Sequence, residues 1–347
     1  MKFVQISVRD KQKERRSRMR RTLKKVIATT VIAAMTFSLT ACGGSDKGSK
    51  DSKEKVYNIG ICQLVEHEAL DAATKGFKEA LIEKLGEDKV KFDEQNAQGE
   101  SATCATIVNS FVSSNVDLIL ANATAPLQSA ANATVDIPIL GTSVTDYATA
   151  LAIDDFTGVV GNNVSGTSDL APIEEQANMI LELFPKAETV GLLYCSAEPN
   201  SKFQVDLIKK NLKKEGIKCK EYSFVDSNDI ASVVQGAVKK SDVIYIPTDN
   251  TAASNTEVID NIARPEGVPI VAGEAGICKG CGIATLSIDY YELGYETGLM
   301  AYDILVNGKD ITKMEIKYAP KVTKQYNKKI ADELKIKIPD GYDEIGE

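Results

Sequence analysis

Residues 56–96 read VYNIGICQLVEHEALDAATKGFKEALIEKLGEDKVKFDEQN. Residues 56–64 are a short apolar run typical of a buried strand. In residues 68–85 the apolar side chains recur at helical spacing, and residues 90–96 form a second strand-like run. Parallel strands need a crossover connection between them. A strand, a helix and a strand in this order therefore predict a βαβ unit.

The same alternation continues along the chain in two successive blocks. The first block predicts helices at 103–113 and 125–132 and strands at 117–121 and 137–140. The pattern then restarts, with helices at 174–184, 201–215, 230–239 and 291–306 and strands at 189–194, 218–224, 243–246, 269–272 and 282–287. An α/β fold with two doubly wound parallel-sheet lobes accounts for this order better than one continuous sheet.

The length of 347 residues is comfortable for two domains of moderate size. We expect one lobe to comprise residues 56–160 and 290–315, and the other to comprise residues 161–289 and 316–347. The crossings between the lobes are predicted near residues 155–169 and 286–290. A third crossing is predicted in the tail, between residues 314 and 339.

The N-terminus has the features of an export signal. A basic segment at 20–25 precedes an apolar run at 26–39, which predicts a signal peptide over residues 1–41 that begins at Met1 or at Met19. The run is too short to span a bilayer, which takes about 20 apolar residues. Leu39-Thr-Ala-Cys42 resembles a bacterial lipobox, in which Cys42 is acylated; the alternative is an ordinary cut that leaves a free Cys42. Residues 42–55 would then form a flexible tether on the extracytoplasmic face of the cell membrane.

The charge distribution excludes one class of partner. The net charge of the chain is −8, but residues 1–41 carry 11 Lys or Arg and 2 Asp or Glu, so the body from Cys42 onward has a net charge of about −17. An acidic body repels phosphate backbones, so we expect no nucleic-acid partner. Acidity that serves only solubility is an equally consistent explanation.

Six further cysteines occur in the body of the chain. Cys278 and Cys281 have the spacing of a redox or metal half-site, and this pair can be structural, a local disulfide or catalytic. A zinc site would need two more ligands, and His67 is the only histidine in the chain, so we expect no metal site. A thioredoxin-type pair would begin a helix directly after a strand. Here we expect the pair between two strands.

Ligands of open parallel sheets bind beyond the carboxyl ends of the strands. The residues that follow the predicted strands are nearly all Ser, Thr, Asn, Gln, Asp or Glu, and they occur at 63–67, 96–98, 122–124, 142–146, 196–201, 248–251, 274 and 289–290. Each could be a simple helix cap, because these types are favoured there. His67 could likewise contact a ligand or cap a helix. As a set they predict a cleft of neutral hydrogen-bonding groups with a few carboxylates.

Such a cleft suits an amino-acid zwitterion. Hydroxyls, amides and helix N-termini can hold a carboxylate, and Asp146, Asp249 or Glu274 can hold an ammonium group. The set lacks Lys and Arg, which disfavours phosphate or citrate. The chain has no Gly-x-Ser-x-Gly elbow and no Gly-rich phosphate loop, and no carboxylate pair is singled out, so we expect neither an enzyme nor a cofactor.

An ordered series of short motifs resembles the tryptophan/tyrosine-type ABC transporter substrate-binding lipoproteins over residues 57–342. The motifs are HEALD at 67–71, NAQG at 96–99, ANAT at 121–124, VTD at 144–146, NVSGTSD at 163–169, EPNS at 198–201, YIPTDN at 245–250, GE at 273–274 and IDY at 288–290. The sequence departs from the family at Glu68, where a proline is usual, and in the order Asn-Ala-Thr-Ala-Pro126.

The resemblance implies a type I periplasmic-binding-protein fold with a three-strand hinge, and ligand capture by lobe closure. It also implies delivery of the ligand to an ABC permease and its ATPase, and we expect a monomer. With the strand-end residues, it suggests these ligand contacts: His67, Asn122, Thr124, Thr145, Asp146, Asn200, Ser201, Thr248, Asp249, Asn250, Glu274 and Asp289.

Three functions remain open at this point. The first is binding of an aromatic amino acid such as tryptophan, tyrosine or phenylalanine, and the second is binding of a nucleoside or other neutral polar solute by the same fold. The third is an exported enzyme that uses the cysteine pair or a carboxylate pair. An aromatic ligand needs a stacking partner, for which the candidates are Tyr147, Tyr194, Phe203, Tyr290 and Tyr291. Core packing is the alternative role for these side chains.

Overall fold

The computed structural model describes residues 55–319 and 321–345. The expected signal peptide, the lipid-attachment residue Cys42 and nearly all of the expected tether lie outside these residues. Within the described part of the chain, no helix combines the length and the apolar character that a membrane crossing requires.

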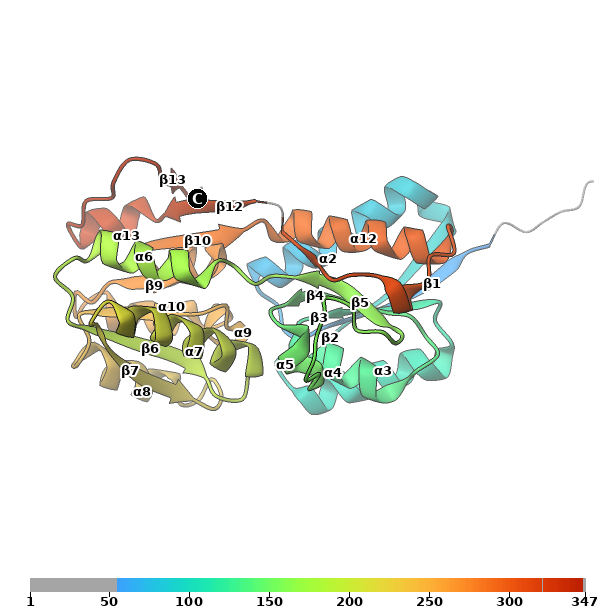
Figure 1. Cartoon of the computed structure of the whole chain (residues 1–347), viewed down its shortest axis with the longest axis horizontal. Coiled ribbons are helices and arrows are strands. Elements are labelled where there is room, and N and C mark those ends of the chain that lie inside the picture. The colour runs from blue at the N-terminus through green and yellow to red at the C-terminus, as the bar shows by residue number, and fades with distance from the viewer. Residues whose placement is uncertain (1–54, 320, 346–347) are drawn as a thin grey trace, which may run out of the picture. The chain divides into compact units, whose positions relative to one another are not determined.

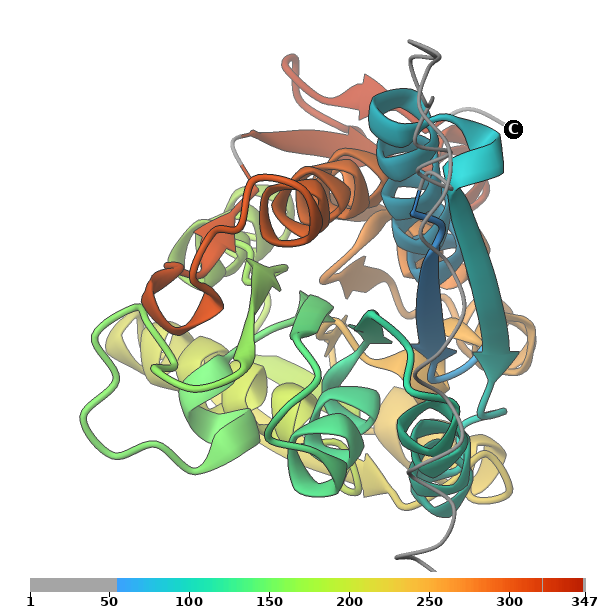
Figure 2. The same ribbon diagram turned by 90° about the vertical axis from the view of Figure 1, so that its right-hand side faces the viewer.

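The first lobe is built on a parallel sheet with the strand order β11-β5-β4-β3-β1-β2 among the described residues. The strands are β1 (Tyr57–Gln63), β2 (Val90–Asn96), β3 (Leu118–Asn122), β4 (Ile139–Val144), β5 (Val164–Ser168) and β11 (Lys317–Tyr318). The helices are α2 (Glu68–Leu85), α3 (Ser101–Ser114), α4 (Thr124–Ala133), α5 (Tyr147–Leu151) and α12 (Tyr290–Leu305), with 3-10 turns at η1 (Glu87–Lys89) and η2 (Ile311–Lys313). Helices α2 and α12 cover one face of the sheet, and α3 and α4 cover the other (Figures 1 and 2).

The second lobe has the strand order β13-β12-β10-β9-β8-β6-β7 among the described residues. Its strands are β6 (Thr189–Cys195), β7 (Lys218–Phe224), β8 (Val243–Ile246), β9 (Ile270–Ala272), β10 (Ala284–Ile288), β12 (Val322–Tyr326) and β13 (Asp343–Glu344). All pairs are parallel except β10 with β12. The helices are α6 (Ile173–Leu183), α7 (Pro199–Lys214), α8 (Ile230–Val238), α9 (Asn250–Ala253), α10 (Thr256–Ala263), α11 (Ala275–Cys281) and α13 (Lys328–Glu333). The predicted two-lobed α/β architecture is confirmed.

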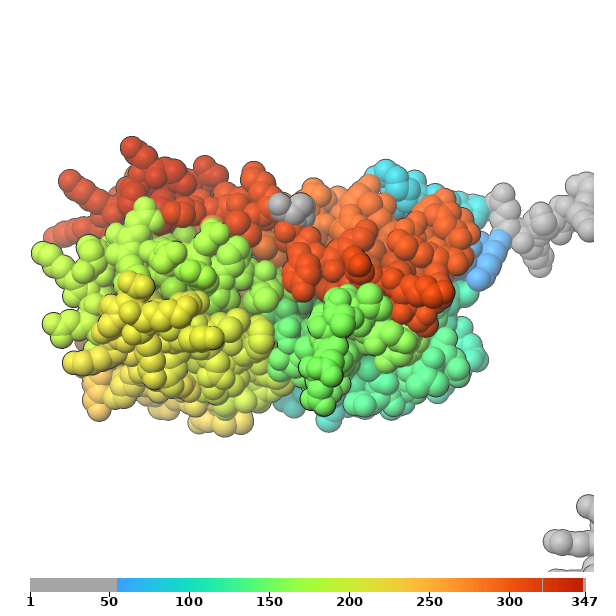
Figure 3. Space-filling model, viewed as in Figure 1, coloured from blue at the N-terminus to red at the C-terminus, as the bar shows by residue number. Residues whose placement is uncertain are grey.

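Among the described residues the chain passes between the two sheets after β5, after β10 and between β11 and β12. In the view of Figure 3 the C-terminal part of the chain, coloured orange to red, lies along the surface of both lobes. Strands β5 and β11 pair within the first sheet, so that sheet extends beyond the expected lobe limits at residues 160 and 315. The segment VSGTS of β5 has no large apolar side chain to mark it as a strand. It is buried by the elements packed around it rather than by its own hydrophobicity.

Helices α2 and α12 come from opposite ends of the chain and pack side by side on the first sheet (Figure 1). Their backbones touch at two glycines. A Cβ atom on Gly294 would lie 1.9 Å from the carbonyl oxygen of Ala73, and one on Gly76 would lie 2.1 Å from that of Tyr291. Only glycine permits this approach. The α12 segment is thereby fixed to the first lobe immediately after the second crossing.

Cys278 and Cys281 lie in α11, a short helix that the sequence pattern did not indicate. Both side chains are buried, and the cysteines of the described residues are free thiols. Burial raises the pKa of Cys281 and of Cys278, so both thiols stay protonated. A protonated thiol is a poor nucleophile and a poor metal ligand, which leaves the structural role for this pair.

Candidate functional site

The carboxyl ends of the first sheet's strands bring the predicted residues of this lobe together. The register aligns Gln63 of β1 with Asn122 of β3, and Asn122 with Thr142 of β4. His67 precedes α2, Thr124 begins α4, and Asp146 accepts a hydrogen bond from the backbone of α5 at 2.7 Å. The sheet topology thus places segments 63–67, 122–124 and 142–146 along one edge.

Four adjacent strands each end at a buried polar atom that has no hydrogen-bond partner among the described residues. The atoms are Nδ1 of His67 after β1, Oδ1 of Asn122 in β3, Oγ of Ser143 in β4 and Oδ1 of Asp169 after β5. Buried polar groups are nearly always bonded, and each exception needs an explanation. The strand order β5-β4-β3-β1 makes these four positions neighbours.

The Asn122 side chain is held firmly in spite of its free oxygen. Its Nδ2 donates to the carbonyl oxygen of Leu70 at 2.8 Å and to Oγ1 of Thr74 at 2.9 Å. Helix α2 therefore fixes the amide, while its acceptor atom, Oδ1, has no hydrogen-bond partner among the described residues. Side chains fixed in this way can recognise a donor without losing much conformational entropy on binding.

Backbone strain accumulates at the same edge of the sheet. Ala123, between Asn122 and Thr124, has φ 100° and ψ 170°, and Ser143 has φ 53°. Gln98, which follows β2, has φ 54°. Residues other than glycine rarely adopt positive φ, and such strain gathers at functional sites.

His67 joins this edge to the second lobe. Its Nε2 lies 3.2 Å from Oδ1 of Asn250, and Nδ2 of Asn250 donates to Glu198 at 2.6 Å. Because that bond fixes Oδ1 of Asn250 as the acceptor, Nε2–H of His67 must be the donor, which leaves Nδ1 unprotonated when the ring is neutral. Burial lowers the pKa of His67, which agrees with a neutral ring. The His67 ring thus presents an unpaired acceptor.

The buried acidic residues Asp249 and Glu274 of the second lobe accept backbone N–H hydrogen bonds on both of their oxygens. Asp249 accepts from the backbone N–H of Ala252 at 2.8 Å and of Cys195 at 2.6 Å. Glu274 accepts from the backbone N–H groups of Gly276 and Ile277 at the start of α11. Burial is the main cause that raises the pKa of Glu274 to about 7 and also raises the pKa of Asp249, which the Glu198 charge raises further.

Glu198 was not among the predicted contacts, yet it organises this side of the cleft. It accepts from the backbone N–H and the side chain of Asn250 and of Thr251, at distances of 2.6 to 3.0 Å. Asn200 adds a bond at 3.2 Å. Glu198 precedes Pro199 at the start of α7, where an acidic residue is an ordinary cap, so no sequence signal separates the two roles.

The remaining predicted residues have several environments. Asn200 and Ser201 both lie against the carbonyl oxygen of Thr248, at 3.2 and 3.5 Å. Thr145 is buried, and its carbonyl oxygen accepts from Ser168. Asp289 is exposed and accepts from the N–H of Glu292 as the cap of α12.

The five aromatic residues considered as stacking partners have different environments. Tyr147 and Tyr194 are core residues whose hydroxyls donate to Thr167 and Glu221 respectively, and Tyr291 bonds Glu79 at an exposed position. Tyr290 is buried where the second crossing meets the first lobe, and its hydroxyl donates to Asp169. Phe203 is half-buried on α7, which contacts α5 of the other lobe. Tyr290 and Phe203 thus differ from the other three candidates in lying on elements where the two lobes meet.

A cavity of about 510 Å³ lies between residues of the two lobes. Thr124 and Gln128 line it from the first lobe, and Glu198, Asn200 and Asn250 line it from the second. Its volume falls in the usual range for small-molecule sites, about 300–1,000 Å³. Three of the predicted contacts, Thr124, Asn200 and Asn250, therefore border one space.

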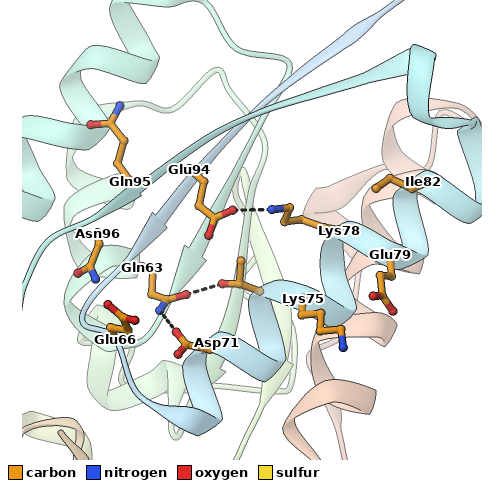
Figure 4. Close-up of a pocket in the computed structure, with 11 residues that line it drawn as sticks. Gln63, Glu66, Asp71, Lys75, Lys78, Glu79, Ile82, Glu94, Gln95 and Asn96 are labelled. Carbon is orange, nitrogen blue, oxygen red and sulfur yellow. Dashed lines mark hydrogen bonds and ion pairs between the residues drawn. The ribbon is translucent and has the colours of Figure 1, made fainter.

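A second cavity of about 670 Å³ lies in the first lobe, between β1, β2 and α2 (Figure 4). Its lining is charged and internally paired: Lys78 bonds Glu94 at 2.7 Å, and Gln63 bonds Asp71 at 2.6 Å. Because all of its lining residues belong to one lobe, movement between the lobes cannot enclose a ligand there. The seam between the lobes, where the cavity of about 510 Å³ lies, is the better candidate site. The residues with unpaired atoms do not line this cavity, but Thr124, which follows Asn122 and Ala123, and Asn250, which bonds His67, do.

Comparison with known proteins identifies the family. Residues 58–343 match the family described as ABC transporter substrate binding protein. The chain belongs to this family. Its members are binding proteins and not enzymes, which excludes the exported-enzyme alternative. The predicted resemblance is confirmed, and the fold is that of the type I periplasmic binding proteins.

Three relatives have informative names. A tyrosine-binding protein of Clostridioides difficile is 38% identical over 83% of this chain and 86% of its own. A Streptococcus pneumoniae domain in complex with L-Trp superposes with a TM-score of 0.80 at 32% identity, and covers 84% of this chain and 99% of its own. A ligand-free, open substrate-binding protein with adhesive properties from Clostridium difficile has a TM-score of 0.65 at 37% identity, with the same coverage.

Proposed function

We propose that this substrate-binding protein captures an aromatic L-amino acid, tyrosine or tryptophan, between its lobes. The observation that carries the proposal is the row of unpaired polar atoms at the ends of β1, β3, β4 and β5. An amino-acid head group has both donors and acceptors, so it can satisfy such a row. The relatives named for tyrosine binding and for a complex with L-Trp support the aromatic side chain.

Capture would work by hinge closure. The first lobe's strand ends bind the ligand, and the second lobe then adds its own contacts across the seam, as His67 already does with Asn250. A ligand that contacts both lobes favours the state in which they meet. The permease of an ABC importer would then recognise that state.

A thermal-shift screen tests the ligand class. We expect L-tyrosine or L-tryptophan at 100 times its dissociation constant to add about 2.7 kcal/mol to the stability of the protein. Adenosine and uridine at equal concentration serve as matched controls of similar size. Stabilisation by the nucleosides but by no aromatic amino acid would overturn the proposal.

The membrane attachment is part of the same proposal. Cys42 would be acylated after removal of residues 1–41, and the acyl chains would hold the protein at the outer face of the cell membrane, because a single chain binds only marginally and two or more bind stably. Metabolic labelling with an alkyne fatty acid should mark the wild-type chain and leave Cys42→Ser unlabelled. Equal labelling of both would refute the anchor.

A further inference from the structure

An ammonium group needs a carboxylate in its binding site, and the described part of the chain offers four buried acidic residues: Asp169, Glu198, Asp249 and Glu274. The three acidic residues of the second lobe already have hydrogen-bond donors on both carboxylate oxygens. Glu198 and Glu274 use both oxygens to bind N–H groups in the first turns of α9 and α11, and Asp249 binds one N–H of α9 and the N–H of Cys195 at the end of β6. A carboxylate that is already bonded at both oxygens gains little from an added cation and would have to give up helix caps to rearrange.

Asp169 differs from all three. It is 2% exposed, its Oδ2 accepts the hydroxyl of Tyr290 at 3.0 Å, and its Oδ1 has no hydrogen-bond partner among the described residues. Isolation of a carboxylate in the protein interior is costly unless a positive group pairs with it. Burial raises the pKa of Asp169, and the nearby hydroxyls of Thr145 and Tyr290 only partly oppose this rise.

The place of Asp169 in the fold also fits a ligand contact. It follows β5 at the start of the first crossing, and its backbone N–H bonds the carbonyl oxygen of Val144. That bond places it beside Thr145, at the same edge as Asn122 and Ser143. Tyr290 approaches from the second crossing, so the carboxylate is held where two connections between the lobes meet.

We propose that the carboxylate of Asp169 binds the α-ammonium group of the ligand and that Tyr290 positions this carboxylate. This inference rests on the proposed function. It adds a requirement for recognition, namely that the ligand carries a free ammonium group. Ligands that lack this group, such as aromatic carboxylic acids, are excluded because they leave the buried charge of Asp169 unpaired. Asp146, Asp249 and Glu274 then act as helix caps.

The test compares L-tyrosine with 3-(4-hydroxyphenyl)propanoate, which lacks only the ammonium group, by calorimetric titration of the exported chain. The wild type should bind L-tyrosine about 100-fold more tightly, which is the usual effect of removing one partner of a buried charge pair. Asp169→Asn keeps the side-chain volume and an acceptor for Tyr290 but removes the charge. This variant should bind L-tyrosine about 100-fold more weakly than the wild type does. Its affinities for the two ligands should then differ by only a few-fold.

Two further variants separate the role of Asp169 from a structural one. Tyr290→Phe should weaken L-tyrosine by about 10-fold while the preference for the ammonium group remains, because the carboxylate is still present. Asp206→Asn, at an exposed position on α7, should bind as the wild type does. Melting curves of each variant show whether it is folded.

The outcomes distinguish the two proposals. Equal wild-type affinity for L-tyrosine and its deaminated analogue overturns the role of Asp169 and leaves aromatic binding intact. If Asp169→Asn weakens the binding of both ligands to the same extent, the proposed role of Asp169 is also overturned, because Asp169 would then affect only the hinge between the lobes. A wild type that binds no aromatic amino acid overturns the proposed function itself, and the inference with it.

Discussion

The strand ends of the two lobes use the same kinds of side chain in opposite ways. In the second lobe, Glu198, Asp249 and Glu274 are buried and fully bonded to N–H groups of their own lobe. In the first lobe, Asn122 and Asp169 are equally buried, yet each keeps one oxygen without a partner among the described residues. These three carboxylates of the second lobe are satisfied by the fold itself, whereas Asn122 and Asp169 leave acceptors that the proposed ligand would satisfy.

This contrast predicts two kinds of variant. Substitutions in the polar network of the second lobe should reduce folding stability whether or not a ligand is present. Substitutions at the unpaired groups of the first lobe should reduce affinity while stability changes little. A protein in which both sets behaved alike would show that the contrast has no functional meaning.

The largest effect is expected at Glu198. Replacement by alanine leaves the N–H groups of Asn250 and Thr251 without their acceptor inside the protein. Stranding buried donors costs about 1–3 kcal/mol for each group, so Glu198→Ala should lower the free energy of unfolding by about 3 kcal/mol. Urea unfolding of the wild type and the variant, both without ligand, measures this change in the free energy of unfolding.

A control for Glu198 is Glu221, a half-buried carboxylate of the same lobe that bonds Tyr194 and Lys209. Glu221→Ala should cost less than about 1 kcal/mol, as is usual for partly exposed ion pairs. If Glu198→Ala cost equally little and instead abolished ligand binding, the second lobe would be the one that recognises the ligand.

A smaller effect, on affinity, is expected at His67. His67→Ala removes the bond to Asn250 and the unpaired Nδ1 acceptor, so ligand affinity should fall about 10-fold, while the stability of the ligand-free protein should change by less than about 0.5 kcal/mol. Glu66→Gln, on the preceding exposed residue, should leave affinity unchanged. A large loss of stability in His67→Ala would assign it a structural role.

The pH dependence of binding follows from the same histidine. Burial lowers the pKa of His67, so the state in which the lobes meet excludes the protonated ring. As the pH falls below the ordinary histidine pKa of about 6.5, protonation of the open state competes with closure, and affinity should decrease. Titrations between pH 8 and pH 5 should show this decrease in the wild type and a smaller decrease in His67→Ala, in which Asp169 still titrates.

The limits of the strongly patterned elements could be predicted from the sequence alone. Predicted segments 68–85, 90–96, 218–224 and 243–246 coincide with α2, β2, β7 and β8. Strand β5 and the short helices α5, α9 and α11 could not be predicted in this way. Their sequences are brief and rich in small or polar residues, and their burial comes from tertiary packing that no local pattern encodes.

The prediction of the candidate site from the sequence was limited in the same way. The rule that ligands lie beyond strand ends selected Asn122 and Thr145, because β3 and β4 are readable from their apolar residues. It could not select Asp169, since the strand before it was not recognised, although Asp169 ends the motif NVSGTSD at 163–169. Nor can sequence show which carboxylates are already bonded, because that depends on atomic positions across the fold.

A stability change of about 1 kcal/mol is expected from the titration of Glu274. Burial raises its pKa to about 7 in the folded protein, above the ordinary value of 4.5. A raised carboxyl pKa stabilises the fold below the unfolded value, and this contribution is lost as the pH rises through 7. Between pH 6 and pH 7 this loss amounts to about 1 kcal/mol, so the melting temperature should fall by about 2–4 °C over that range relative to Glu274→Gln, in which the group does not titrate. A steeper fall in the variant would contradict the assigned sign.

The smallest change is expected at Ala123, and it tests whether the strain of the first lobe is real. Ala123→Gly loses a buried methyl group and adds unfolded-state entropy, which together cost about 1.5 kcal/mol, while relief of the φ of 100° returns about 1–3 kcal/mol. The net change should be near zero. Ala121→Gly, equally buried in β3 but unstrained, lacks the compensation and should lose about 1.5 kcal/mol. Equal losses in the two variants would mean that the strand end is relaxed. In that case the unpaired atoms beside it would be its only special feature.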